Sequence, residues 1–307
     1  MLDIRQLSIS FSSYGFGLKK REIQAIRSLD LSINAGEVLA VVGQSGAGKS
    51  LLAHALLGVL PKNAHLSGVL TFKGKDLTPM EMSRLRGREI ALVPQSMTCL
   101  NPLLHVGVQI ARAAELSGVK PKASWNATLD ALRRYRLDER VAQRFPFQLS
   151  GGMARRILTA TATIGNADLI LADEPTNGLD PLSANETLGH LRQLADTGKA
   201  VLLITHDIEA ALLVSDRVTI FCGGVTVEDA LARDFNGAGK LRHPYSRALW
   251  DALPGRGFIE SLPIQSIGFQ NGGCPFSVHC CNRKAQCDDI LPEMKKQNNG
   301  RVRCWHA

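Results

Sequence analysis

The chain has 307 residues, of which 45% are hydrophobic, and its net charge is +8. This hydrophobic content supports a full core, which excludes disorder as the default state. The longest apolar runs, 38–42 and 201–204, are far shorter than the ~20 residues that cross a bilayer, and residues 1–6 lack the basic start and apolar core of a signal peptide. We therefore expect a cytosolic protein that reaches a membrane only through a partner.

The positive charge raises the question of a nucleic-acid ligand. The basic residues are spread out, with only short runs at 19–21 and 133–134, and aromatic residues make up only 5% of the chain. Proteins that bind single-stranded nucleic acids interleave basic and aromatic side chains. A basic face that meets a protein partner or anionic headgroups is therefore the favoured interpretation.

The predicted elements begin with alternating apolar and polar residues at 1–34, which indicate antiparallel strands with one solvated face and a loop at 15–21. From residue 36 onward, strands and helices alternate as in a parallel α/β sheet. We expect strands at 38–42, 169–172 and 200–204. Between them we expect an inserted helical subdomain at about 96–150, with helices at 108–116 and 124–135.

A glycine-rich loop follows strand 38–42, and a helical run at 50–57 follows the loop. The loop has the pattern G-x-x-x-x-G-K-S and consists of Gly43, Gln44, Ser45, Gly46, Ala47, Gly48, Lys49 and Ser50. In this context the backbone N–H groups and the helix N-terminus face one anion, as in phosphate-binding loops. Lys49 would reach the terminal phosphates, and the Ser50 hydroxyl would ligate magnesium. The loop therefore predicts a nucleoside triphosphate ligand.

Two acidic residues, Asp173 and Glu174, follow strand 169–172. Ligands of open α/β sheets bind at the carboxyl ends of the strands, so both residues should lie near the loop. We assign magnesium binding to Asp173, as the Walker B acid. We assign the activation of the attacking water to Glu174 as general base, a role worth about 10²–10⁴ in rate. Strand 200–204 should deliver His206 to the same edge, where its imidazole would contact the γ-phosphate.

The stretch Leu-Ser-Gly-Gly-Met at 149–153 predicts a second anion site. Ser150 is placed to cap the next helix, and Gly151 and Gly152 leave the first N–H groups of that helix uncovered. The loop at 43–50 already holds one triphosphate completely. We therefore expect head-to-tail pairing, in which the serine-glycine turn of one subunit closes over the nucleotide of another.

These motifs, with Gln95 and the run Gly178-Leu179-Asp180, resemble ABC-transporter ATPase subunits in order and spacing. The resemblance implies an α/β fold: a P-loop NTPase ABC-type nucleotide-binding domain with a RecA-like core, an antiparallel β subdomain and a helical subdomain. It implies that Gln95 is the Q-loop residue, which joins magnesium to the transmembrane partner. It also implies that Ser150, Gly151 and Gly152 form the signature motif, Asp180 is the D-loop acid and His206 is the switch histidine.

In the family, an aromatic side chain near the end of the first strand stacks on adenine. Phe11 is our candidate for this role, with Tyr14 second.

Three stretches resemble one subfamily, the oligopeptide, dipeptide and nickel importers. Residues 94–102 resemble their Q-loop stretch, Met153 is typical of the first of their two ATPase subunits, and 243–249 resemble the segment after the ATPase core. Two residues depart from the pattern of this subfamily: Ala154, directly after the signature methionine, and Gly178. Both departures leave the catalytic positions intact.

The resemblance implies ATP and Mg²⁺ as cofactors and a peripheral position on the cytoplasmic face of the membrane. It implies as partners a second related ATPase chain in a heterodimer, two transmembrane permease subunits and an extracytoplasmic substrate-binding protein.

Five of the seven cysteines lie after residue 273. Cys274, Cys280, Cys287 and Cys304 form a set of four thiolates, with Cys281 as an extra neighbour, and in a reducing cytosol such a set favours a metal over disulfides. Chemistry alone leaves zinc and an iron–sulfur cluster open, and incidental free thiols are the simpler alternative. The resemblance favours a 4Fe–4S cluster, which related peptide-importer subunits carry in this segment.

We therefore expect an ATP-binding domain at 1–235, a linker and C-terminal extension at 236–271, and a cysteine-rich metal or iron–sulfur segment at 272–307. The expected function is ATP hydrolysis that powers an importer of peptides, nickel or metal chelates across the cytoplasmic membrane. One alternative is a non-transport ABC ATPase that acts on nucleic acid, and another is a metal-binding regulator. The first usually has two ATPase halves or long coiled coils, which this sequence lacks, so we expect no nucleic-acid partner.

Overall fold

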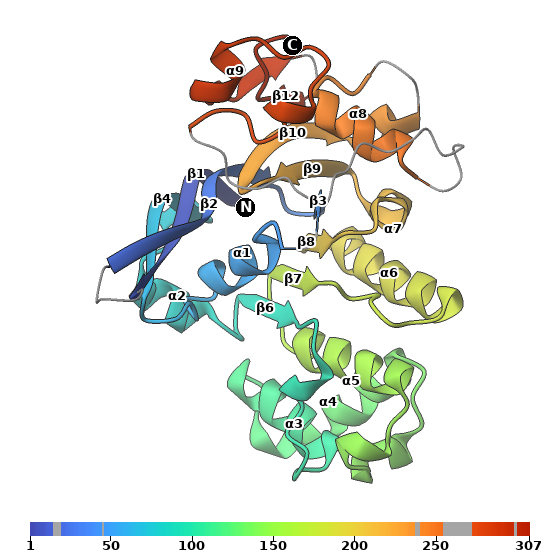
Figure 1. Cartoon of the computed structure of the whole chain (residues 1–307). Helices are drawn as coiled ribbons and strands as arrows, with labels where there is room; N and C mark the ends of the chain where they lie inside the picture. The colour runs from blue at the N-terminus through green and yellow to red at the C-terminus, as the bar shows by residue number, and fades with distance from the viewer. Residues whose placement is uncertain (15–19, 45, 237–239, 254–271, 298–299) are drawn as a thin grey trace.

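A computed structural model describes residues 1–14, 20–44, 46–236, 240–253, 272–297 and 300–307 of the chain. Its centre is a mixed sheet with the strand order β5-β4-β1-β2-β10-β9-β3-β8-β7-β6 (Figure 1). The first four strands of this order pair antiparallel with one another, β2 pairs parallel with β10, and the last five strands run parallel. The α/β architecture expected from the sequence is confirmed.

The antiparallel part of the sheet is built from the N-terminal residues and the chain after the first helix. Leu7, Ile9 and Leu31 are completely buried, which confirms the alternation predicted for 1–34. The second strand starts at Lys20, so pairing extends into the end of the expected loop, while residues 15–19 lie outside the described residues. The strands are β1 (Leu2–Tyr14), β2 (Lys20–Ile33), β4 (Ala64–Phe72) and β5 (Lys75–Asp76).

The parallel part of the sheet contains the three strands expected from the sequence and two more. Every residue of β3, β7 and β8 is buried, as expected for strands covered by helices on both faces. The strands are β3 (Val38–Gly43), β6 (Ile90–Val93), β7 (Leu169–Asp173), β8 (Ala200–Thr205) and β9 (Arg217–Cys222), followed by β10 (Val225–Leu231), which is antiparallel to β9.

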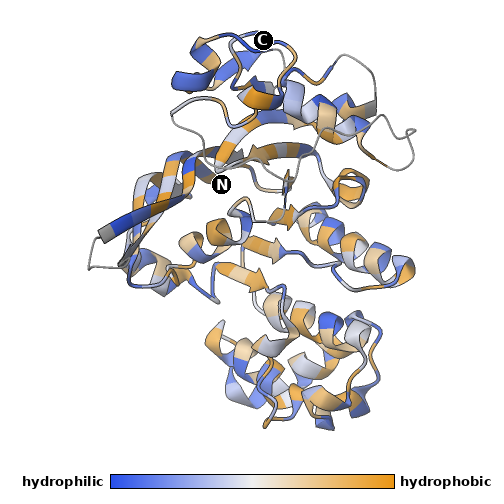
Figure 2. Cartoon of the chain, in the orientation of Figure 1, coloured by the Kyte–Doolittle hydropathy of each residue, from blue (hydrophilic) through white to orange (hydrophobic). Residues whose placement is uncertain are grey.

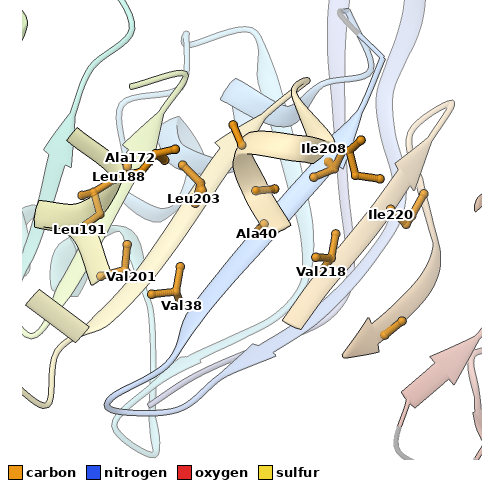
Figure 3. Close-up of a cluster of buried hydrophobic side chains, with 14 of the residues drawn as sticks. Val38, Ala40, Ala172, Leu188, Leu191, Val201, Leu203, Ile208, Val218 and Ile220 are labelled. Atoms are coloured by element: carbon orange, nitrogen blue, oxygen red, sulfur yellow. The ribbon is translucent and has the colours of Figure 1, made fainter. Parts of the chain in front are cut away.

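Successive residues of the parallel strands face opposite layers of the core, because side chains alternate along a strand. Val38 and Ala40 pack toward α6 (Pro181–Asp196) and α7 (Ile208–Val214), as Figure 3 shows. Leu39 packs in the other layer, which includes residues of α1 (Lys49–Leu56). The strands therefore read as continuous apolar segments, orange in Figure 2.

The helical subdomain has a core of its own, in which Ile110, Leu132 and Ile157 are completely buried. Figure 1 shows it beyond β6, at the bottom of the view. Its helices agree with the expected ranges 108–116 and 124–135 to within three residues at each end. They are α3 (Val106–Leu116), α4 (Pro121–Arg134) and α5 (Gly151–Thr163), whereas the short α2 (Pro79–Leu85) lies beside the antiparallel strands.

The C-terminal extension packs against the sheet and shares its core. β12 pairs antiparallel with β10, and Tyr245 and Phe276 are buried in the same cluster as β9 and β10. A helix, α8, lies within the segment 236–271, of which 237–239 and 254–271 are outside the described residues. The elements of the extension are α8 (Pro244–Asp251), α9 (Gln286–Asp289), β11 (Lys295–Gln297) and β12 (Gly300–Val302).

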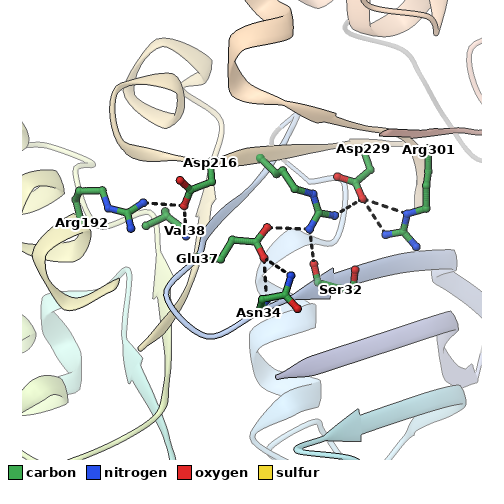
Figure 4. A network of polar contacts seen from close by, with 9 residues as sticks. Ser32, Asn34, Glu37, Val38, Arg192, Asp216, Asp229 and Arg301 are labelled. Atoms are coloured by element: carbon green, nitrogen blue, oxygen red, sulfur yellow. Dashed lines mark hydrogen bonds and ion pairs between the residues drawn. The ribbon is translucent and has the colours of Figure 1, made fainter. Parts of the chain in front are cut away.

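A buried carboxylate joins the extension to the sheet (Figure 4). Asp229 of β10 is 1% exposed and accepts hydrogen bonds from Arg217 of β9 and, at 2.8 Å, from Arg301 of β12. Arg217 also donates to Glu37 at 2.8 Å. Because both guanidiniums are needed to compensate a carboxylate removed from water, this pairing fixes β12 against β10.

We expect Arg303→Met to destabilise the whole fold by about 3–5 kcal/mol, because it leaves a buried carboxylate without its cation. Arg303 is 6% exposed and donates to Asp30, to Ser28 Oγ at 3.2 Å and to two backbone carbonyls. Chemical denaturation of the full chain measures the change. The control is Arg283→Met, which removes an exposed pair with Asp288 and should leave the midpoint almost unchanged. Equal midpoints for both variants would contradict a structural role for the extension.

Candidate nucleotide-binding site

The glycine-rich loop connects the end of β3 to α1, as expected, with Ser45 outside the described residues. Gly43 must be glycine, because a Cβ there would lie 2.1 Å from the carbonyl oxygen of Phe221 on β9. Gly46 and Gly48 have φ angles of 81° and 92°, which other residues rarely adopt. Backbone geometry alone thus explains three glycines of the motif.

Lys49 closes the loop on itself. Its Nζ donates to the carbonyl oxygens of Gly43 at 2.7 Å and Gln44 at 2.8 Å, and the residue is 6% exposed. Burial lowers the pKa of Lys49, and the carboxylates of Glu174 and Asp173 oppose this shift. The ammonium group therefore lies at the loop with neutral carbonyl partners, and a bound anion can replace these carbonyls as its acceptor.

Ser50 and Asp173 form a pair of oxygen donors across the site. The Ser50 hydroxyl donates to Oδ1 of Asp173 at 3.1 Å, which joins the start of α1 to the end of β7. Burial raises the pKa of Asp173, and the hydrogen bond from Ser50 opposes the shift. A hydroxyl and a carboxylate at this spacing are the oxygen ligands that Mg²⁺ prefers.

Glu174 lies at the next position, with a left-handed φ of 47°. Such a conformation is uncommon for a residue with a long side chain and stores about 1–3 kcal/mol of strain. The carboxylate accepts a hydrogen bond from Thr205 Oγ1 at 3.3 Å, and His206 Nδ1 lies 2.8 Å and 2.9 Å from its two oxygens. Thr205 at the end of β8 and His206 directly after it therefore hold the Glu174 carboxylate.

The loop, Gln95 and Glu174 border one hollow of about 670 Å³ that is open to solvent. The fold thus brings the loop, Gln95 from the end of β6 and Glu174 from the end of β7 to one place. The residues that line it are Gly46, Gly48, Lys49, Ser50, Leu51, Gln95 and Glu174.

The serine-glycine turn does not line this hollow. Ser150 caps α5 as expected, since its Oγ accepts a hydrogen bond from the N–H of Met153 at 3.3 Å, and both Ser150 and Gly151 are exposed. Asp180 likewise caps α6 through a hydrogen bond of 3.0 Å from the N–H of Ser183, and it too lies away from the hollow. Within one chain, the turn and Asp180 face solvent.

Phe11 is half-buried on β1, where it packs against the core of the antiparallel part, and it does not line the hollow. The side chain of Tyr14 lies outside the described residues. The adenine-stacking role stays a prediction.

The comparisons with known proteins agree with this geometry. The family model described as "ABC transporter" matches residues 26–177. The dipeptide transport ATP-binding protein DppD of Bacillus subtilis is 33% identical, over 99% of this chain and 94% of its own length. The oligopeptide transport ATP-binding protein OppD of Escherichia coli is 31% identical, over 99% of this chain and 92% of its own length.

Solved structures give the same result. One of them is the dimeric post-hydrolysis state of the ATP-binding cassette MJ0796, bound to ADP and Pi. It has a TM-score of 0.67 to this chain and 26% sequence identity, and the match covers 76% of this chain and 99% of the MJ0796 chain. The chain belongs to the ABC transporter family. As a member of this family it binds ATP and hydrolyses it, which confirms the expected fold class and activity. The names of these relatives mention neither nickel nor an iron–sulfur cluster.

Two residues of this ABC ATPase site escaped the sequence analysis. Thr205 orients Glu174 and also accepts a hydrogen bond from the N–H of Asp207 at 3.0 Å. Its position, as a hydroxyl residue at the end of an otherwise apolar strand, is the sequence feature that could have indicated this role. Arg155 is buried on α5 behind the site, and no local pattern distinguishes it from the neighbouring Arg156.

The four cysteines of the expected metal set line one narrow cavity in the C-terminal extension of this ABC protein. His243 Nε2 lies 3.7 Å from Sγ of Cys274, and burial lowers the pKa of this histidine to about 3. Burial also raises the pKa of Cys274 to about 11. Within the described ranges, no group of three or more histidine, cysteine or acidic side chains could hold a metal ion. Cys281 is exposed and lies outside the cavity.

No helix in the described parts of the chain has the length and apolar character needed to span a bilayer.

Proposed function

We propose that this chain is the ATPase subunit that powers an importer of peptides, bound peripherally at the cytoplasmic face of the membrane. The hollow that collects Lys49, Ser50, Gln95 and Glu174 carries the ATPase assignment. The peptide assignment rests on relatives named for dipeptide and oligopeptide transport, which match almost the whole chain. Nickel and metal chelates remain the alternative cargo.

The proposed roles follow from the contacts. Lys49 exchanges the carbonyls of Gly43 and Gln44 for the terminal phosphates, a change from neutral to charged acceptors. Ser50, Asp173 and Gln95 would hold Mg²⁺, which neutralises charge on the phosphates when it is bound. The carboxylate of Glu174, oriented by Thr205 and His206, takes the proton of the attacking water.

Ser150 and Gly151 of the turn and Asp180 are exposed, which supports head-to-tail pairing of two cassettes. The uncovered N–H groups at the start of α5 would bind the phosphates of ATP held by the other subunit. The cassette MJ0796 is described as dimeric, and it is similar to this chain over most of its length. We propose a related second ATPase chain as the partner, as Met153 suggests.

A large apolar groove next to Gln95 is the proposed docking place of a transmembrane permease subunit. It lies between the end of β6 and helices α3 and α5, has a free volume of about 1290 Å³, and includes Pro94, Leu104 and Val108. Leu104 and Val108 are 41% and 45% exposed. Exposed apolar side chains around a groove mark a protein partner. A second permease and an extracytoplasmic substrate-binding protein would complete the importer.

Purification of the tagged full chain from membranes tests this proposal. We expect two permease subunits and a second ATPase chain to copurify, and peptides to stimulate ATP hydrolysis when the substrate-binding protein is added. Stimulation by nickel instead would assign the alternative cargo. Recovery of the chain with DNA or RNA, lost as the salt concentration rises, would instead favour the non-transport ATPase, which none of the reported relatives suggests.

We further propose the division into residues 1–235, 236–271 and 272–307, with a 4Fe–4S cluster in the last part. A zinc ion requires four sulfurs about 2.3 Å from one centre. Cys274, Cys280, Cys287 and Cys304 line one shared cavity. The choice of a cluster over zinc rests on the sequence resemblance to peptide-importer subunits. These cysteines would hold the cluster, which would link four distant points of the extension.

We expect the chain, purified without oxygen, to contain iron and acid-labile sulfide in equal amounts, with visible charge-transfer absorption. Cys274→Ser should remove most of both, because the cluster loses a thiolate ligand. The control is Cys281→Ser, whose thiol lies outside the cavity and whose replacement should leave both contents unchanged. Zinc in place of iron would support the alternative metal, and a metal-free chain would identify incidental thiols.

A further inference from the structure

Arg155 is a buried cation on α5, the helix that starts at the serine-glycine turn. The residue is 4% exposed, although it stands four positions from the exposed Gly151. Its Nη1 donates to the carbonyl oxygen of Pro94 at 2.8 Å, and its Nη2 donates to the carbonyl oxygen of Asn177 at 3.3 Å. One side chain thus holds two loops that are 83 residues apart in the sequence.

Both loops carry residues of the ATP site. Pro94 immediately precedes Gln95, and Asn177 belongs to the turn that begins at Glu174, since the N–H of Asn177 donates to the carbonyl oxygen of Glu174 at 3.2 Å. Asn177 is also the third residue before Asp180. The guanidinium therefore connects the helix of the serine-glycine turn to the backbone around Gln95 and around Glu174.

Burial of the Arg155 guanidinium carries a large desolvation cost. The hydrogen bonds described for it go to backbone carbonyls rather than to a carboxylate, and its Nε has no partner among the described residues. Burial lowers the pKa of Arg155, and the nearby carboxylate of Asp173 opposes this shift. An apolar side chain would pack α5 against the core at a lower desolvation cost, so stability by itself does not account for an arginine here.

We propose that Arg155 is a positioning residue for ATP hydrolysis, which sets Gln95 and Glu174 relative to each other from the helix of the serine-glycine turn. Its planar fork reaches two carbonyls at once, and lysine could not span both in this way. Movement of α5, as the other subunit or the permease engages, would then shift both catalytic loops together. This inference rests on the proposed function.

The test uses the assembled complex, with Arg155→Gln and Arg155→Lys. The affinity for ATP should change less than about threefold, because the loop at 43–50 is untouched. For Arg155→Gln, kcat should fall roughly 10–100-fold and the KM for ATP should stay unchanged. Arg155→Lys should recover part of the rate, because its ammonium group keeps the charge and can donate to one of the two carbonyls. Arg134→Gln, which removes an exposed arginine at the end of α4, is the matched control and should keep the full rate.

The inference is overturned if Arg155→Gln hydrolyses ATP as fast as Arg134→Gln. It is also overturned if ATP affinity and kcat fall by the same factor, or if neither Arg155 variant folds, because the role would then be structural only. If only Arg155→Lys folds, its kcat and KM decide in the same way. Glu174→Gln in the same assay separates the two proposals. If Glu174→Gln hydrolyses ATP, the proposed roles at the site are refuted. If Glu174→Gln is inactive and Arg155→Gln is fully active, only this inference is refuted.

Discussion

Glu174→Gln is expected to stop ATP turnover by the assembled complex while ATP still binds. The amide keeps the shape of the side chain and can still contact Thr205 and His206, but it cannot accept the proton of the attacking water. The loss of a general base corresponds to about 10²–10⁴ in rate. Release of phosphate measures the turnover, and calorimetric titration with ATP measures the binding.

The control for this experiment is Asp207→Asn, one residue beyond His206. Asp207 caps α7 through a hydrogen bond of 2.9 Å from the N–H of Ala210, and asparagine preserves that cap. We expect Asp207→Asn to hydrolyse ATP at the normal rate. Hydrolysis by Glu174→Gln at the rate of this control would show that another group activates the water.

Lys49→Ala is expected to weaken ATP binding by about 10–100-fold, since a hydrogen bond to a charged group contributes about 1.5–3 kcal/mol. The ammonium group is held at the loop by the carbonyls of Gly43 and Gln44, and its loss leaves the phosphates without their nearest cation. The measurement is the dissociation constant of ATP for the full chain in the presence of Mg²⁺.

Lys199 provides a matched control at the other end of the sheet. Its Nζ donates to the carbonyl oxygen of Ala167 at 2.7 Å and to Asn166 at 3.2 Å, so it resembles Lys49 in its contacts but lies away from the hollow. Lys199→Ala should bind ATP normally. An equal loss of affinity in both variants would mean that fold stability, and not contact with phosphate, explains the effect of Lys49→Ala.

The features of the candidate ATP site that the sequence indicates are local. The loop at 43–50 follows one apolar strand and begins one helix, so its glycines and Lys49 form a recognisable pattern within a few residues. Asp173, Glu174 and His206 likewise stand at the ends of apolar runs. Because parallel strands end at one edge of a sheet, topology alone indicated that these three residues would lie near the loop.

Contacts between distant segments could not be predicted in this way. Arg155 reaches a carbonyl 61 residues earlier in the chain, and Arg303 reaches Asp30 across 273 residues. In the sequence both are arginines among other basic residues. Only the packed structure shows that each is buried and which backbone or carboxylate it holds.

The sequence by itself determined the α/β class, three strands of the parallel part, and the chemistry of the triphosphate loop, because these depend on periodicity and on motifs within short segments. The tertiary structure alone decided that the cysteine-rich extension shares the core of the sheet and that Arg155 joins two catalytic loops. These features depend on burial and hydrogen bonding between segments far apart in the chain, which no local pattern records.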